Sequence, residues 1–148
     1  RSIIMKTTRL VYLIATAFLF VFASCKKDDN SSSSSSSPTV GIVTQGQWQI
    51  TSFTENGINH TNHFTGHSFT FASNGALSAT NGTVTATGSW STATDDSQQK
   101  LVINFNSTPT FSELNSDWHI ITQTSSKVTL EDVSGGGSGT DYLTFEKL

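Results

Sequence analysis

Apolar and polar residues alternate with a period of two along residues 41–148, and no long stretch has the 3.6-residue period of an amphipathic helix. The alternation restricts this segment to strands whose apolar side chains share one face of a sheet. Threonine and serine supply 19 and 14 of its 108 residues, a composition that favours strands and loops. Eight strands are predicted, over residues 48–54, 67–72, 76–80, 83–92, 100–105, 117–124, 127–133 and 140–148.

The predicted strands are joined mostly by short turns, which favours an antiparallel meander. Residues 73–75 predict a tight turn, and Asn81 with Gly82 predicts a two-residue type I′ hairpin, since both central residues of that turn need a positive φ. Eight such strands can close into a barrel and so leave no exposed edge. The predicted fold class is therefore all-β, an eight-stranded antiparallel up-and-down barrel.

Two longer connections interrupt the series of strands joined by short turns. Residues 55–66 predict a lid or a short helical turn. Residues 109–115 predict one helical turn, with Thr108 as the N-cap and Pro109 at the first helical position. Phe111 and Leu114 are three residues apart in it and would share one face.

The N-terminal segment, residues 1–24, reads as a secretory signal peptide. Met5 is the expected start, and the residues before it read as upstream translation or a misplaced start codon. Lys6 and Arg9 form a basic region before the apolar residues 10–22. That run is shorter than the roughly 20 residues that a membrane-spanning helix needs, and small residues follow it, as a cleavage site requires.

Cys25, the single cysteine of the chain, directly follows the apolar run and the pair Ala23-Ser24. This sequence resembles the lipobox of bacterial lipoproteins. The resemblance implies that Cys25 carries a diacylglyceryl group on its sulfur and becomes the acylated N-terminus, with fatty acids such as palmitate. The alternative is a plain secretory signal with an incidental Cys25.

The segment after Cys25 continues with Lys26, Lys27, Asp28 and Asp29. These four residues resemble the export tag of surface lipoproteins of Bacteroidetes; the alternative is a solvated charge cluster beside the lipid. The resemblance implies a protein anchored by lipid to the outer membrane, at the cell surface. Seven serines follow, so residues 25–40 are expected to form a flexible tether and residues 41–148 the barrel domain.

The charge balance limits the partners of the mature chain. Without the signal peptide, five lysines stand against eleven acidic residues, a net charge of −6. Such a chain has no basic face for nucleic acid and no attraction to anionic lipid headgroups, so the acyl chains would hold it to the membrane. A single cysteine also excludes an intramolecular disulfide and a zinc site built on several cysteines.

Several short motifs resemble those of lipocalin-like domains of Bacteroidetes lipoproteins over residues 41–148. They include Gly46-Gln-Trp48 at the first strand, the segment Gly88-Ser-Trp90, and the closing Leu143-Thr-Phe-Glu-Lys147. The resemblance implies that Gly46, Trp48 and Lys147 close the barrel, with Trp48 as its floor and Lys147 as the basic partner. The full set of three lipocalin motifs is not present, so no ligand chemistry follows from the resemblance.

Three histidines, His60, His63 and His67, lie close together in the sequence. Three imidazoles can hold zinc with one open coordination position. Their segment is a loop that runs into a strand, and nothing in the sequence directs three side chains there to one point. We therefore predict no metal and no cofactor; His119 is expected to be half-buried or to face the barrel interior.

The sequence holds no recognisable catalytic constellation. Serine and threonine are too abundant for one nucleophile to stand out, and no Gly-x-Ser-x-Gly elbow occurs. Asp95 and Asp96 could serve as paired carboxylates, but neighbouring side chains tend to point apart, so a solvated turn is expected. The glycine-rich residues 135–139 precede no helix and lack the Lys-Ser/Thr of a phosphate loop. The chain is predicted not to be an enzyme.

The sequence predicts a membrane-anchored, non-catalytic, monomeric lipoprotein with a lipocalin-like barrel that binds a small apolar or amphipathic ligand. Small eight-stranded barrels hold one such ligand or are filled by side chains. The alternative is therefore a cell-surface interaction or scaffold module with a filled barrel and a carbohydrate or envelope-protein partner. No ligand-binding residues are assigned.

Overall fold

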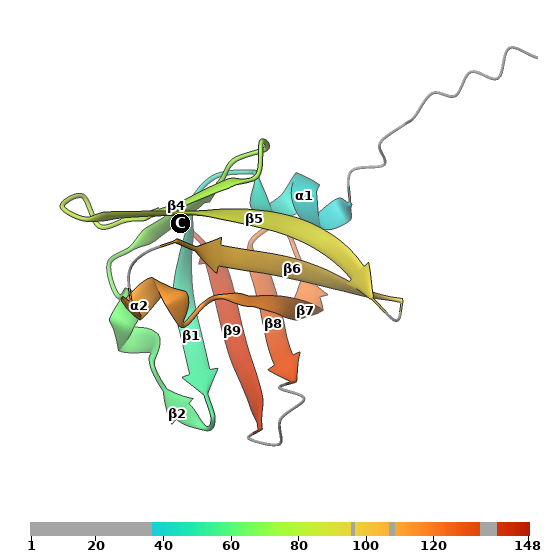
Figure 1. The fold of residues 1–148 in the computed structure, drawn as a ribbon. Helices are drawn as coiled ribbons and strands as arrows, with labels where there is room; N and C mark the ends of the chain where they lie inside the picture. The colour runs from blue at the N-terminus through green and yellow to red at the C-terminus, as the bar shows by residue number, and fades with distance from the viewer. Residues whose placement is uncertain (1–36, 96, 107–108, 134–138) are drawn as a thin grey trace, which may run out of the picture. The chain divides into compact units, whose positions relative to one another are not determined.

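The computed structural model describes residues 37–95, 97–106, 109–133 and 139–148 (Figure 1). Strands dominate these ranges, and none of their helices is long and apolar enough to cross a bilayer. The elements in chain order are α1 (Pro38–Val43), β1 (Trp48–Glu55), β2 (Ile58–Asn59), the 3₁₀ helix η1 (Thr61–Phe64), β3 (Ser68–Phe71), β4 (Ala76–Thr80), β5 (Thr85–Asp95), β6 (Gln98–Phe105), α2 (Pro109–Ser112), β7 (Ser116–Gln123), β8 (Lys127–Val133) and β9 (Thr140–Lys147).

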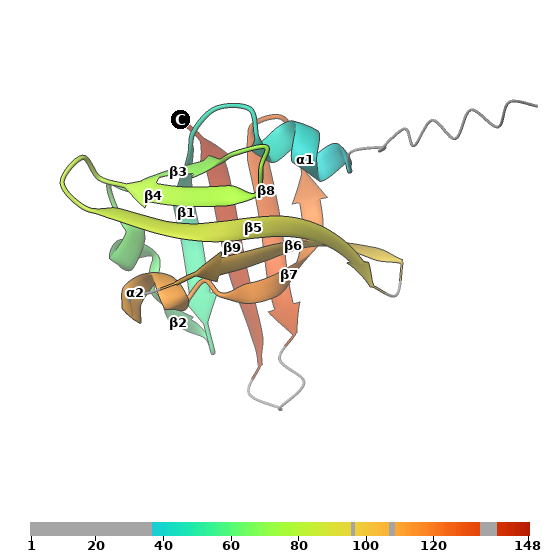
Figure 2. The same cartoon turned by 45° about the horizontal axis from the view of Figure 1, so that its top comes forward.

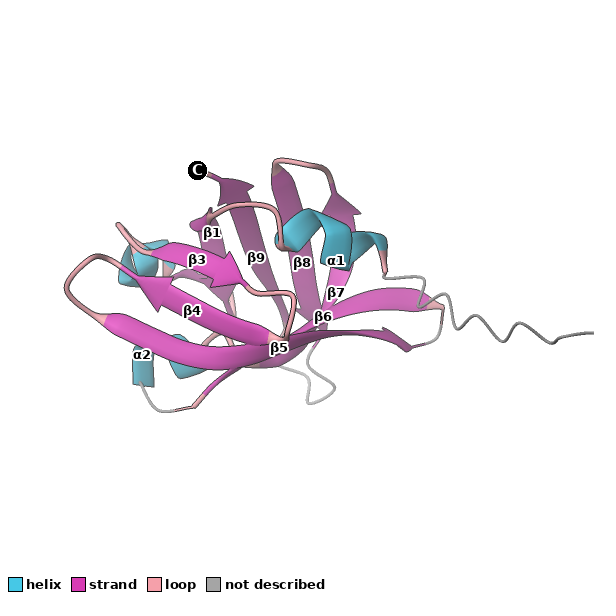
Figure 3. Cartoon of the chain, turned by 90° about the horizontal axis from the view of Figure 1, so that it is seen from above, coloured by secondary structure: helices cyan, strands magenta, loops and turns pink. Residues whose placement is uncertain are grey.

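The strands form a closed ring. Each strand from β3 to β9 is antiparallel to the next, and β9 returns to pair with β1 from Trp48 opposite Lys147 to Thr54 opposite Tyr142. A single residue pair, Trp48 with Phe69, joins β1 to β3. β2 pairs only with the end of β1, so the ring has eight strands (Figure 3). The predicted eight-stranded antiparallel up-and-down barrel is confirmed.

The eight strands of the ring have buried apolar side chains that alternate with more exposed ones, as a half-buried sheet requires. β1 departs from strict alternation at a register shift between Ile50 and Ser52, which returns Phe53 to the interior. A bulge of this kind inserts one residue and bends the strand. The buried apolar side chains of the strands are Trp48, Ile50, Phe53, Phe69, Phe71, Leu77, Ala79, Ala86, Trp90, Leu101, Ile103, Phe105, Trp118, Val128, Leu130, Leu143 and Phe145.

β5 is longer than predicted and curves across the barrel (Figure 2). Its pairing with β6 continues as far as Asp95 opposite Gln98, so the hairpin extends beyond the apolar part of both strands. Gly88 lies in the middle of β5, where a Cβ would come within 2.2 Å of the Asn104 carbonyl oxygen. The glycine therefore permits a close approach of the two backbones.

The predicted type I′ turn at Asn81-Gly82 is wrong, because that loop has four residues between Thr80 and its partner Thr85. The Asn81 side chain accepts hydrogen bonds from the backbone N–H groups of Thr83 and Val84, which stabilises a wider turn. Only Gly82 of the predicted pair has a positive φ, of 87°.

The two-residue hairpin occurs instead at Asn56-Gly57, where both residues have positive φ, 50° and 80°. Glu55 pairs with Ile58 on either side of this turn. The Asn56 N–H also donates a hydrogen bond of 2.7 Å to the Asp141 carboxylate of β9. The segment predicted as a lid or helical turn thus contains a hairpin, β1 to β2, followed by the single turn η1.

The sequence does not predict helix α1. It assigns residues 38–40, the first half of this helix, to the tether. Pro38 occupies its first turn, where a missing N–H costs nothing. Val43 is buried, and the fully buried Thr39 donates a 2.8 Å hydrogen bond to the Gln123 side chain of β7. The Thr39 hydrogen bond and the burial of Val43 hold the helix on the barrel. The folded part therefore begins at Pro38 and not at Gly41.

Helix α2 confirms the predicted helical turn at Pro109, although Thr108 lies outside the described residues. Phe111 and Leu114 are both buried, with 4% and 0% of their surface exposed. The predicted shared apolar face therefore packs on the barrel.

Candidate functional site

Aromatic rings meet across the interior of the barrel. Phe53 of β1 contacts Trp118 of β7 with ring centroids 6.3 Å apart, and Phe69 of β3 contacts Phe105 of β6 at 6.4 Å. Strands β1 and β7, like β3 and β6, are not neighbours in the ring. These contacts must therefore span the interior, and their steep interplanar angles of 75° and 80° are the favoured edge-to-face arrangement.

Helices α1 and α2 lie on opposite sides of the barrel (Figures 1, 2 and 3). We call the region of α1, the start of β1 and the end of β9 the α1 end. The region of α2, η1 and the end of β1 is the α2 end. The two ends differ in the side chains that they present to solvent.

The three residues predicted to close the barrel lie together at the α1 end. Trp48 is fully buried, and its indole N–H donates a 2.9 Å hydrogen bond to the Val43 carbonyl of α1. Lys147 is the residue opposite Trp48 in the β1–β9 register. Gly46 has a φ of 95°, and a Cβ there would lie 2.9 Å from Lys147 Cε, so the lysine stem covers this glycine.

The α2 end is closed by a similar set of contacts. Trp118, 1% exposed, donates its indole N–H to the Leu114 carbonyl at 2.9 Å. Phe64 of η1 contacts Phe53 of β1 at 5.7 Å and Phe111 of α2 at 5.6 Å between ring centroids. These rings join η1 and α2 to each other and to the barrel wall.

A polar cluster lies on the outer side of these rings and consists of His60, His63 and Glu113. The potential metal-ligand atoms of the three side chains are all within 4.8 Å of one another. His63 Nδ1 lies 2.9 Å from Glu113 Oε2, and His60 Nε2 lies 4.0 Å from Glu55 Oε2. Their side chains are 24% to 35% exposed, so the cluster is open to solvent.

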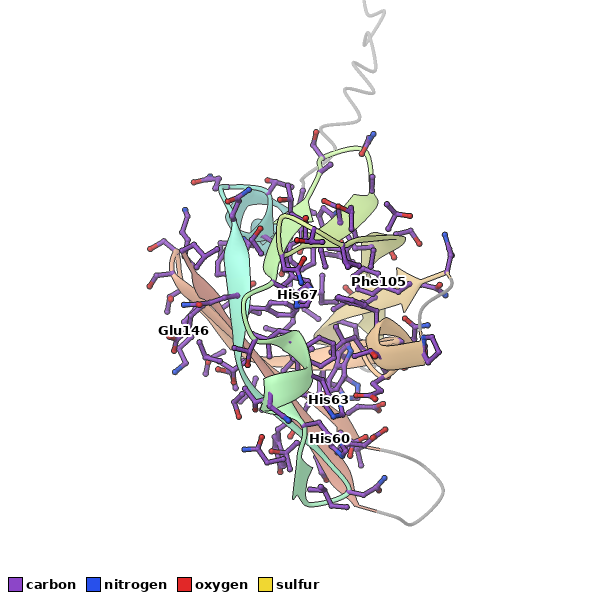
Figure 4. All side chains as sticks on the ribbon, turned by 90° about the vertical axis from the view of Figure 1, so that its left-hand side faces the viewer. His60, His63, His67, Phe105 and Glu146 are labelled. Atoms are coloured by element: carbon purple, nitrogen blue, oxygen red, sulfur yellow. The ribbon has the colours of Figure 1, made fainter. Side chains whose placement is uncertain are left out.

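His67 does not join this cluster, although the sequence groups it with the other two. Figure 4 shows His60 and His63 close together and His67 well apart from them. The His67 ring instead packs edge-on against Phe111, with centroids 5.2 Å apart. The third member of the cluster is Glu113, which is 50 residues away from His63 along the chain and is not among the candidates of the sequence.

A second charged group lies on the outer wall beside the α1 end. Lys100 Nζ is 2.7 Å from Asp117 and 3.1 Å from Asp95, and its side chain is only 9% exposed. The hydrogen bonds to both carboxylates raise the pKa of Lys100, and the bond from Lys100 lowers the pKa of Asp117. Asp95 therefore forms an ion pair with Lys100.

His119, Asp96 and the candidate residues before the barrel remain to be located in the structure. His119 is half-buried; its neighbour Trp118 points inward, so His119 faces outward, opposite Lys100 and Glu131. Asp96 lies outside the described residues. So do Cys25 and the four residues of the predicted export tag, Lys26, Lys27, Asp28 and Asp29, as well as all but the last glycine of the loop 135–139.

Comparison with known proteins supports the fold alone. No protein-family profile matches the chain, and no curated protein matches it. A similar solved structure is that of a DUF4847 family protein from Bacteroides vulgatus ATCC 8482, with a TM-score of 0.51 and 19% sequence identity. The match covers 74% of this chain and 97% of the other chain.

Proposed function

We propose that this protein is a membrane-anchored, non-catalytic lipoprotein whose filled barrel serves as an interaction module at the cell surface. The observation that carries the proposal is the contact of aromatic rings from strands that are not neighbours. In an eight-stranded barrel the interior is just wide enough for side chains to fill it. Rings that meet across it occupy the space that a small apolar ligand would need.

The rings around Phe105 are closely packed. Its ring lies 5.1 Å from Phe111 and 6.4 Å from Phe69, and all three residues are at most 4% exposed. Phe69 in turn contacts Phe145 at 5.3 Å. A ligand could enter this level only by displacing several rings, each of which stabilises the fold by burial. The filled interior therefore favours the interaction module over the small-ligand carrier.

The direction of display supports the same proposal. A lipid on Cys25 would join the folded part through α1, where the described chain begins. β1 then runs eight residues away from this end, from Trp48 to Glu55, which is about 23 Å of strand. Under this proposal the α2 end, with its half-exposed polar side chains, is the end farther from the attachment of the tether and is the one that meets a carbohydrate or protein partner.

An apolar-probe titration separates the filled barrel from the ligand carrier. We expect the wild-type chain to show no saturable binding of a fluorescent naphthylamine probe or of benzene. The variant Phe105→Ala should gain binding of benzene, because the apolar cavity left by one phenyl ring stays dry and accepts a molecule of that size. Phe69→Ala, which removes a ring that contacts Phe105, serves as the second variant if Phe105→Ala does not fold. Saturable binding by the wild type would establish the ligand carrier instead.

A pair of photo-crosslinkers tests the direction of display in living cells. Ile58 on β2 and Leu148 after β9 are matched, with 62% and 63% of their surface exposed. A crosslinking residue at position 58 should capture a defined envelope component, and one at position 148 should not. Equal capture at both positions would contradict a preferred end. Cys25→Ala should move the protein from the membrane fraction to the soluble exported fraction, which tests the anchor separately.

A further inference from the structure

The cluster at the α2 end contains three side chains of the types that bind transition metals. His60, His63 and Glu113 offer two imidazole nitrogens and a carboxylate oxygen within 4.8 Å of one another. The two imidazole rings lie 5.0 Å apart between centroids, in an edge-to-face arrangement. None of these side chains is needed to fill the barrel, since all three lie on its outer side with a quarter to a third of their surface exposed.

The histidines of the cluster are held by backbone contacts of η1. His60 N donates to the Phe53 carbonyl at 2.9 Å, and His63 N donates to the His60 carbonyl at 3.0 Å. Thr61 Oγ1 accepts a 2.8 Å hydrogen bond from Phe53 N, which fixes the start of η1 on β1. Phe64, 1% exposed, anchors its end in the core. The two imidazoles therefore project from a segment whose backbone is fixed on both sides.

The carboxylate of the cluster is fixed by the residues that follow it. Leu114 is fully buried next to Glu113. Asn115 then binds both backbone groups of Phe105: its Oδ1 accepts from Phe105 N at 2.6 Å, and its Nδ2 donates to Phe105 O at 3.1 Å. On the N-terminal side of Glu113, the Phe111 ring contacts Phe64 of η1 and holds α2 in place. Glu113 is thus held toward His63 by the fold rather than by their own hydrogen bond alone.

We propose that His60, His63 and Glu113 form a binding site for a divalent transition-metal ion of the Zn²⁺ class. Two histidines and one glutamate are a donor set that suits zinc, whereas Mg²⁺ and Ca²⁺ require oxygen donors. Three protein ligands leave one coordination position for water or for a group of a partner molecule. The site goes beyond the proposed interaction module, whose anchor and filled barrel do not depend on a metal.

The geometry needs only small adjustments. With bonds of about 2.0–2.1 Å, ligand atoms around a tetrahedral zinc ion lie about 3.3 Å apart. The separations in the cluster start at the 2.9 Å between His63 and Glu113 and do not exceed 4.8 Å. Rotations of exposed side chains that move each ligand atom by about 1 Å would close the site. Glu55 Oε2, 4.0 Å from His60 Nε2, lies beyond hydrogen-bond distance and contributes only its negative charge to the site.

The test is a titration of the full chain with zinc chloride. The protein is kept free of any histidine tag and carries Cys25→Ser in every sample, so that no thiol competes for the metal. We expect one Zn²⁺ per chain by calorimetry, and no comparable binding of Mg²⁺ or Ca²⁺. Removing a ligand should raise the dissociation constant at least as much as the ~10–100-fold that removal of an outer-shell partner costs. This change is expected for His60→Ala, His63→Ala and Glu113→Gln.

Two matched variants use the remaining histidines of the chain. His119→Ala and His67→Ala should leave zinc affinity unchanged, because both residues lie outside the cluster. In the nuclear magnetic resonance spectrum, the imidazole signals of His60 and His63 should shift on zinc addition while those of His67 and His119 stay. Far-ultraviolet circular dichroism of each variant checks that it is folded.

The possible results decide the proposal. Absence of stoichiometric zinc binding by the folded wild-type chain would overturn it. So would an unchanged affinity in folded Glu113→Gln, or an equal loss in His119→Ala, which would indicate non-specific binding to surface histidines. A loss in His67→Ala without a loss in Glu113→Gln would assign the metal to the three histidines that are close in sequence.

Discussion

The two ends of the barrel are closed by the same device but present different chemistry to solvent. At each end a buried tryptophan donates its indole N–H to a backbone carbonyl at 2.9 Å, Trp48 to Val43 and Trp118 to Leu114. At the α1 end the residue opposite the tryptophan is a cation, Lys147. At the α2 end the closing segments also carry His60, His63 and Glu113 on their outer side.

This difference shows that stability and surface chemistry are separate properties of the two ends. The tryptophans and the helices that cover them stabilise the fold at both ends. Polar residues at the α2 end can change without loss of the core, because their neighbours Phe64 and Leu114 supply the burial there. The predictions below test whether the two closures are equivalent in energy and different in charge.

The largest effect is expected from removal of either closing tryptophan. Trp48→Ala and Trp118→Ala should each lower the free energy of unfolding by about 3–5 kcal/mol, because a fully buried aromatic side chain is replaced by a cavity. Urea denaturation measures the loss. Tyr142→Ala, an aromatic residue that is 45% exposed, is the control and should change stability by less than about 1 kcal/mol. A small loss for one tryptophan alone would show that the two closures are not equivalent.

A smaller effect is expected from alanine at a glycine of each end. Gly46 and Gly66 have φ of 95° and 78°, so an L-residue at either position costs about 1–2 kcal/mol. A Cβ at Gly46 also meets Lys147 Cε at 2.9 Å, whereas nothing lies within 4 Å at Gly66. Gly46→Ala should therefore destabilise the protein slightly more than Gly66→Ala does, because the flexible end of the lysine must shift.

The lysine contact accounts for this difference and can be removed. In a Lys147→Ala background, Gly46→Ala should cost the same as Gly66→Ala, as measured by denaturant unfolding of all variants. If Gly46→Ala keeps its larger cost in that background, the Lys147 contact does not explain the difference.

A third prediction concerns the pair Trp48 and Lys147. The two residues are cross-strand partners in the register, and a lysine ammonium that lies over an indole face contributes about 0.5–2 kcal/mol. A double-mutant cycle with Trp48→Phe and Lys147→Met should give a coupling energy in that range. Additive effects of the two substitutions would mean that Lys147 extends to solvent and that burial alone closes this end.

The smallest effect is expected at the outer ion pair beside the α1 end. The hydrogen bond from Lys100 lowers the pKa of Asp117 below the ordinary aspartate value of 3.8, so the pair stabilises the fold above that pH. Its contribution is lost as the pH falls through the lowered pKa of the folded state. The pKa of Lys100 is raised above the ordinary 10.5, so the lysine side of the pair is lost only at higher pH.

Asp117→Asn should therefore reduce the urea midpoint at pH 7 and have little effect below the lowered pKa that Asp117 has in the folded state. Because Asp117 is 59% exposed, the difference at pH 7 should also shrink in high salt. A difference that is the same at both pH values would show that the carboxylate acts through a contact other than its charge.

The strands were predictable because their signal is local. Period-two alternation depends on neighbouring residues, and β4 and β8 begin and end at the predicted residues. The pairing of β1 with β9 followed from a chain of short connections, since eight meandering strands with one apolar face can bury that face by closing into a ring. The same local reasoning failed for the two Asn-Gly pairs, which the sequence alone does not distinguish. The Asn56 turn is favoured by a contact with Asp141, 85 residues away.

Other features depend on residues that are far apart in the sequence. α1 is a short helix held by the hydrogen bond from Thr39 to Gln123 of β7, 84 residues later, and by the burial of Val43. The meeting of Phe53 with Trp118 across the interior, which favours a filled barrel, required the closed ring.

The sequence by itself determined the strands, their antiparallel order and the residues with a buried face, because alternation, turns and hydrophobicity act over a few residues. Only the tertiary structure decided which side chains share a site. His60 and His63 are close in the sequence, but their third partner Glu113 joins them from 50 residues beyond His63. That meeting depends on the packing of Phe64 against Phe111, a contact between two helical turns whose positions the closed barrel fixes.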